Sequence, residues 1–118
     1  MPSIDRDRNI IYHMLKYCDE VATAHDDFSH SKEKFMISST YRNAITMPIL
    51  QIGELSNHLS EAFKLQYRQI PWNAMRGIRN LMAHQYQSVD FDVIWDTSRN
   101  DIPDLRAFCA SYLEANNA

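Results

Sequence analysis

Breakers of regular structure are scarce in this sequence. The 118 residues include only two glycines and four prolines, and long stretches contain neither. Because β-rich architectures need many tight turns, which draw on glycine and proline, this distribution favours helices joined by few connections. An apolar content of 45% is ordinary, and a chain of this length can bury one hydrophobic core. We therefore expect a single all-α domain over residues 1–118.

Four segments space their apolar residues three to four positions apart, as amphipathic helices do. We expect helices over residues 5–24, from residue 34 or 38 to 63, from 71 to 84, and from 90 or 92 to 113, with residues 25–31 as a loop. Pro48 should kink the second helix without ending it, Pro71 suits the first turn of the third, and Pro103 should bend or split the fourth. The sequence predicts an antiparallel four-helix bundle, or a five-helix bundle if Pro103 splits the last helix.

The cysteines and the N-terminus bear on the cellular compartment. Cys18 and Cys109 stand far apart with no CxxC pair, so we expect reduced core thiols rather than zinc ligands or a disulfide. The first residues are charged, and no run approaches the roughly 18 apolar residues that span a bilayer. We expect a cytoplasmic protein.

The charges are unevenly spread, although their sum is only −3. Between residues 62 and 89 there is no Asp or Glu, while Lys64, Arg68, Arg76 and Arg79 lie inside that stretch. Exposed charges are screened beyond about 8 Å at physiological salt, so an RNA phosphate responds to the local field. We expect Arg76, Arg68 and Lys64 to bind RNA; the alternative is that these cations form an ordinary solvated face.

The usual enzyme motifs are absent, including GxGxxG, the P-loop, HExxH and GxSxG. No two of the five histidines stand three or four residues apart, so we expect no metal site and no cofactor. His13, His25 and His30 are expected to be ordinary surface or partly buried residues.

A group of polar residues near the end of the third predicted helix can carry chemistry. Arg76, Asn80 and His84 are spaced four residues apart and share one helical face, and Arg79 lies one position off that line. An imidazole and a guanidinium on neighbouring positions of one helix can together transfer protons and bind an anionic group. His84 titrates near neutral pH, and the planar guanidinium of Arg79 suits a phosphate.

This stretch resembles the signature of the HepT-like ribonuclease toxins of the HEPN superfamily, which is an Arg, four residues, a His, one residue and a Tyr. Arg79, His84 and Tyr86 match it. The resemblance covers roughly residues 35–113, through the segments ILQIGELSNHLSEAF, IPW and VDFDVIWDTSRNDIPDL, whereas the N-terminal helix matches only in pattern.

The resemblance implies a homodimer joined through the motif helices and a metal-independent endoribonuclease in a type VII-like toxin–antitoxin system. A dimer would place two copies of His84 and doubled cations in one cleft. The family partner is a nucleotidyltransferase antitoxin, called MntA, that transfers AMP to the tyrosine matched here by Tyr86. The alternatives are a non-catalytic helical module that presents a substrate to a nucleotidyltransferase, and a dimerisation domain without chemistry.

Three residues outside the motif carry open interpretations. Glu54 lies one helical turn before His58 and can simply pair with it at the surface, or it can support the site by orienting Arg79 or a motif histidine. Trp72 and Trp95 can stack on bases, but we expect them to be buried in the core or in a dimer interface.

Overall fold

The computed structural model describes residues 2–75 and 90–116, with side chains from residue 6 onward. Its elements are the helices α1 (Pro2–Asp27), α2 (Lys32–Ile37), α3 (Ser39–Ser56) and α4 (Glu61–Gln66), a helical turn at residues 72–75, α6 (Phe91–Asp96), the π-helical turn η2 (Thr97–Asp101) and α7 (Ile102–Ala115). All regular structure in these two ranges is helical, which confirms the all-α prediction.

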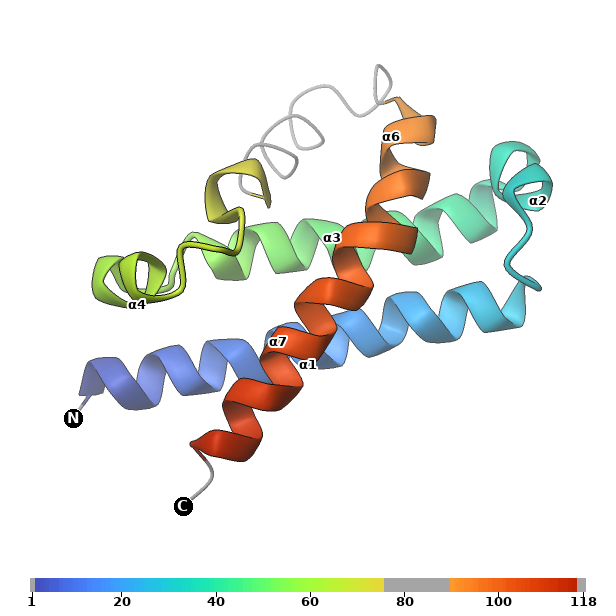
Figure 1. The fold of residues 1–118 in the computed structure, drawn as a ribbon. Helices are drawn as coiled ribbons and strands as arrows, with labels where there is room; N and C mark the ends of the chain where they lie inside the picture. Colours follow the sequence, from blue (N-terminus) through green and yellow to red (C-terminus); the bar gives the residue numbers. More distant parts are fainter. Residues whose placement is uncertain (1, 76–89, 117–118) are drawn as a thin grey trace.

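Two long helices and one oblique helix make up the framework (Figure 1). α1 and α3 lie side by side and run in opposite directions, and the continuous helix formed by α6, η2 and α7 crosses them diagonally. α7 packs on α1, and α2 packs between the start of α3 and α6. None of the described helices is long and apolar enough to cross a membrane.

The predicted second helix is wrong as a single element, because serines end and restart it twice. Ser38 adopts an extended conformation between α2 and α3, and its hydroxyl accepts a hydrogen bond from the backbone N–H of Tyr41 at 3.2 Å. Ser60 caps α4 in the same way, through the N–H of Phe63. Such a cap satisfies backbone donors that a helix start otherwise leaves unpaired. Ser38 was one of the two expected starts, and α3 indeed begins directly after it.

Asp7 joins the second of these breaks to α1. Its side chain is buried, and its two carboxylate oxygens accept hydrogen bonds from the Ser60 backbone N–H (2.8 Å) and the Ser60 hydroxyl (2.6 Å). A buried carboxylate needs such donors to offset its lost hydration. The contact fixes the start of α4 on the N-terminal part of α1.

α1 is longer than predicted and ends at Asp27 rather than at residue 24. Ser29 and His30 then adopt left-handed backbone angles, with φ of 62° and 54°. The N–H of His30 donates to the carbonyl oxygen of His25 at 2.8 Å, which satisfies one carbonyl of the last helical turn. His25, expected in a loop, therefore lies within the helix.

The prolines alter the helices only locally and do not end them. α3 continues through Pro48, as predicted. Pro103 does not split the last helix, because it lies in the first turn of α7, directly after η2. There the N–H of Ile102 donates to the carbonyl of Thr97, five residues earlier, and this wider turn accommodates the proline without a break.

The core joins all of these helices through the predicted apolar stripes. Trp72 and Trp95 are buried, which confirms core packing over base stacking, and Cys18 and Cys109 are buried free thiols whose pKa values are raised by burial. Val93 was expected to be part of the last stripe but is half-exposed. The other core residues include Ile10, Ile11, Met14, Val21, Phe35, Tyr41, Ile45, Ile49, Ile52, Leu59, Phe63, Ile94, Ile102 and Leu105.

Candidate functional site

The predicted catalytic motif lies between the two described ranges. Arg76, Arg79, Asn80, His84 and Tyr86 all belong to residues 76–89, which are outside the described residues. The structure does describe the framework at both ends of this segment. Residues 72–75 form a helical turn directly before the segment, and the described chain resumes at Asp90, at the start of α6.

Trp72 anchors the helical turn at residues 72–75, directly before the motif segment. Its indole N–H donates to the carbonyl oxygen of Tyr67 at 3.1 Å, and its ring is buried. One turn further, the N–H of Met75 donates to the carbonyl of Pro71 at 3.1 Å. Pro71 therefore opens the helix, where its missing N–H leaves no donor unpaired.

A cluster of five aromatic rings holds this anchor between α4 and α7. The ring of Phe63 lies 6.0 Å from that of Trp72, and Phe108 of α7 lies 6.1 Å from Trp72 and 5.2 Å from Tyr67. Tyr112 completes the cluster, 5.2 Å from Phe63. Edge and tilted ring pairs of this kind contribute about 0.5–1.5 kcal/mol each beyond their buried area. The aromatic cluster thus fixes the position of the helical turn at residues 72–75.

The other end of the motif segment is fixed by polar contacts of α6. Asp90 caps α6, as predicted, and accepts a hydrogen bond from the N–H of Asp92 at 2.9 Å. Asp92 in turn pairs with Lys32 of α2 at 3.0 Å, and the guanidinium of Arg42 lies 5.0 Å from the centre of the Phe91 ring. Both flanks of residues 76–89 are therefore tied to different helices of the bundle.

Two of the predicted RNA-binding residues, Lys64 and Arg68, meet beside the start of the motif helix. They line one hollow of about 530 Å³ between α4 and residues 70–74. Glu61 lies one position outside the acid-free stretch, and its carboxylate pairs with the ammonium of Lys64 at 3.4 Å. Lys64 is therefore partly neutralised within its own helix, while Arg68 is exposed at the rim.

Glu54 does pair with His58, as one of its two interpretations expected. Its carboxylate lies 3.3 Å from Nε2 of His58, and the side chains of Glu54 and His58 are 39% and 52% exposed. Its other expected role concerns Arg79 and His84, which are outside the described residues.

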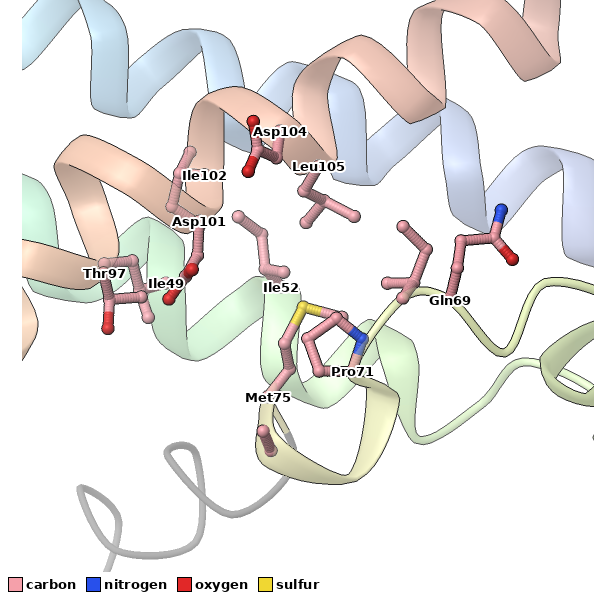
Figure 2. Close-up of a pocket in the computed structure, with 12 residues that line it drawn as sticks. Ile49, Ile52, Gln69, Pro71, Met75, Thr97, Asp101, Ile102, Asp104 and Leu105 are labelled. Atoms are coloured by element: carbon pink, nitrogen blue, oxygen red, sulfur yellow. The ribbon is translucent and has the colours of Figure 1, made fainter.

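An apolar cavity also adjoins the helical turn at residues 72–75 (Figure 2). It measures about 170 Å³ and separates α3 from η2 and α7. Asp101 and Asp104 contribute exposed carboxylates at its edge, which would repel a phosphate. The apolar lining consists of Ile49, Ile52, Ile70, Pro71, Ala74, Met75, Ile102 and Leu105.

The sequence prediction missed a buried hydrogen-bonded chain centred on His25. The side chain of His25 is only 3% exposed. Its Nδ1 lies 2.5 Å from the Tyr41 hydroxyl, and its Nε2 lies 2.9 Å from Oγ of Ser98. Because the Ser98 hydroxyl donates to the carbonyl of Trp95 at 2.7 Å, it accepts from Nε2–H, and Nδ1 accepts from the tyrosine hydroxyl.

These hydrogen bonds keep the imidazole of His25 in its neutral form. Burial, the largest cause, and the nearby charges of Arg99 and His30 together lower its pKa to about 4. The expectation that His25 is an ordinary surface or partly buried residue is thus wrong, because its side chain is almost fully enclosed. The signal was present, because His25 follows Cys18 and Val21 at helical spacing.

The other histidines outside the motif are surface residues, as predicted. His13 is exposed, and His30 lies between Asp26, at 2.6 Å, and the guanidinium of Arg99. Within residues 2–75 and 90–116, no three His, Cys, Asp or Glu side chains come together as metal ligands would.

These features define an all-α domain in which α4, α6 and α7 frame a segment with an Arg, His and Tyr motif. A family model described as "Ribonuclease HepT-like" matches residues 14–112. The chain belongs to this HepT-like family.

Three relatives illustrate the similarity. "Putative RNase MJ1380" of Methanocaldococcus jannaschii is 25% identical over 81% of this chain and 86% of its own length. "Putative RNase TTE0752" of Caldanaerobacter subterraneus subsp. tengcongensis is 26% identical over 83% of this chain and 86% of its own. "Probable ribonuclease HepT" of Thermococcus cleftensis is 34% identical over 63% of this chain and 67% of its own. No solved structure matches the chain.

Proposed function

We propose that this chain is a metal-independent endoribonuclease and the toxin of a type VII-like toxin–antitoxin pair. The observation that carries the proposal is the spacing of Arg79, His84 and Tyr86 in a member of the HepT-like family. The names of the relatives, which describe RNases, support the same reaction. The functional unit is one domain over residues 1–118, acting in the cytoplasm.

The reaction begins with attack of the ribose 2′-oxygen on the adjacent phosphorus. His84 takes the proton of the 2′-hydroxyl, a bond forms between the 2′-oxygen and phosphorus, and the bond to the 5′-oxygen breaks. A second imidazole protonates that leaving oxygen, which leaves a 2′,3′-cyclic phosphate on one product. Arg79 neutralises the charge that develops on the phosphorane oxygens, with Arg76 and Asn80 as supporting residues.

The second imidazole comes from a homodimer in this proposal. One protomer carries a single motif histidine, so a two-fold axis beside the motif helices supplies the acid and the base from two copies of His84. The aromatic cluster around Trp72 holds the helical turn that directly precedes the motif segment against α4 and α7. Glu54 would support the cleft from α3.

Tyr86 is the proposed site of neutralisation. A cognate nucleotidyltransferase of the MntA type would transfer AMP from a nucleoside triphosphate to the phenolic oxygen and release pyrophosphate. The added phosphate is negative and would lie two residues from His84, where the RNA backbone must bind. Repulsion and steric blockage then stop RNA binding while the bundle stays folded.

The test is cleavage of a mixed RNA pool by the purified protein, with and without excess chelator. The wild type should cut in both conditions, and His84→Ala should be inactive while its helix content is unchanged. His13→Ala is the matched control, because His13 is exposed on α1, and it should cut at the wild-type rate. Cleavage by His84→Ala at the parental rate would refute the assignment. An unmodified wild type that cuts no RNA, yet accepts AMP on Tyr86, would favour the non-catalytic module.

A further inference from the structure

The hollow between α4 and the start of the motif helix has a composition that the cleavage chemistry does not use. Its volume of about 530 Å³ is within the roughly 300–1,000 Å³ of small-molecule sites. Its lining combines cations, an amide and exposed apolar surface. The lining residues are Glu61, Lys64, Leu65, Arg68, Ile70, Pro71, Trp72, Asn73 and Ala74.

The apolar part of the lining is unusually exposed. Leu65 is 67% exposed although it lies within α4, and Pro71 beside it is also exposed. Trp72 contributes only a small part of its surface, since its ring is buried in the aromatic cluster. A flat apolar group can therefore pack against Leu65 and Pro71 but cannot stack on the indole face.

The polar part suits a nucleotide. The amide of Asn73 offers both a donor and an acceptor, as the edge of a nucleobase requires. The Lys64 ammonium is paired with Glu61, whereas Arg68 takes part in no ion pair among the described residues. Arg68 is thus the cation that can give a phosphate its full charge and its planar pair of donors.

We propose that this hollow is a nucleotide subsite that receives one unpaired base of the RNA substrate. The base packs on Leu65 and Pro71, Asn73 hydrogen-bonds its edge, and Arg68 binds the adjoining phosphate. A base inside a duplex is stacked and paired and cannot enter a concave site, and the deep, narrow major groove of A-form RNA keeps side chains from its base edges. The substrate class is therefore single-stranded RNA, and this conclusion rests on the proposed ribonuclease function.

The test measures binding separately from cleavage. The affinities of labelled oligouridylate, oligoadenylate and their duplex are measured by fluorescence anisotropy on the full-length His84→Ala protein. Single strands should bind at least tenfold more tightly than the duplex. Adding Leu65→Ala should weaken single-strand binding about fivefold, and the loss should disappear on an oligonucleotide that lacks its bases. Adding Arg68→Ala should lower the slope of log affinity against log salt by about 0.7, the value for one single-strand phosphate.

Two matched controls lie at the other end of the molecule. Ile37→Ala removes an aliphatic side chain that is 78% exposed, and Lys34→Ala removes an exposed cation; both lie in α2. Neither should change affinity or salt slope. Unchanged single-strand affinity in both Leu65→Ala and Arg68→Ala would overturn the subsite, as would equal binding of the duplex.

The outcomes also separate the two proposals. Base-dependent binding through Leu65 in a protein whose wild type cuts no RNA would leave the subsite standing and refute the nuclease. Suppose instead that the wild type and Leu65→Ala cut RNA equally well, but the antitoxin no longer neutralises Leu65→Ala. That result would assign the hollow to a protein partner and overturn the nucleotide subsite.

Discussion

Acidification should destabilise this fold through His25 in a predictable pH range. The folded protein keeps the imidazole neutral, because Nδ1 accepts from the Tyr41 hydroxyl and Nε2–H donates to Ser98. Protonation would turn Nδ1 into a donor facing a donor and would place a charge in the core. The unfolded chain has no such restriction and takes up the proton first.

The size of the effect follows from the two pKa values. The pKa of His25 is lowered from 6.5 to about 4 on folding, chiefly by burial. A lowered histidine pKa leaves stability intact above pH 6.5 and removes it progressively as the pH falls to about 4. At about 1.4 kcal/mol for each pH unit between these values, the free energy of unfolding should fall by about 3 kcal/mol.

Urea unfolding of the wild type and of His25→Gln between pH 7 and pH 4 measures this loss. Glutamine keeps one acceptor and one donor but does not titrate. Between pH 7 and pH 4, the free energy of unfolding of His25→Gln should therefore fall by about 3 kcal/mol less than that of the wild type. His13→Gln, which changes an exposed histidine, should follow the wild type.

An NMR titration of the His25 ring provides a check that does not depend on the variant folding. It should give a pKa near 4. Identical pH profiles for the wild type and His25→Gln, or a ring that titrates at its usual pKa, would refute the assignment of the buried chain.

Three further predictions concern the fold and the motif. Asp7→Ala removes two charged hydrogen bonds to Ser60, so it should lower the free energy of unfolding by about 2 kcal/mol in urea titrations. Asp27→Ala, at an exposed position, should change it by less than about 0.5 kcal/mol. Arg79→Lys should cut RNA at least tenfold more slowly, since an ammonium cannot make the paired phosphate contact; an unchanged rate would transfer that role to Arg76. In coexpression with the nucleotidyltransferase followed by intact-mass analysis, the wild type should gain AMP and Tyr86→Phe should not, so that Tyr86→Phe escapes neutralisation.

Periodicity predicted the helices well where burial alone decides the structure. The spacing of Ile45, Ile49 and Ile52 predicted the buried face of α3, and Asp90 was recognisable as a cap because its side chain acts on its own backbone neighbours. Such features depend on nearby residues, which a single sequence displays directly.

The failures depend on contacts between distant parts of the chain. Serine is tolerated inside helices as well as at their caps, so the break at Ser60 became decisive only through Asp7, 53 residues away. His25 was placed in a loop because the predicted first helix stopped at residue 24, although helical spacing from Val21 continues to it.

The candidate site also has a part that depends on nearby residues and a part that depends on distant contacts. The motif of Arg79, His84 and Tyr86 is local and is readable from the sequence alone. The hollow beside it is not, because α7 and α4 must first meet in the aromatic cluster before Arg68 and Asn73 line one surface. The pairing of Lys64 with Glu61 was missed since the acid lies one residue outside the basic stretch.

The most direct test of the central claim is the chemistry of the new RNA ends. Wild-type protein in excess chelator should produce fragments that end in a 2′,3′-cyclic phosphate, partnered by fragments with a free 5′-hydroxyl, and His84→Ala should produce neither. Fragments with 3′-hydroxyl and 5′-phosphate ends, or cyclic ends formed equally by His84→Ala, would contradict attack by the 2′-oxygen with His84 as the proton carrier.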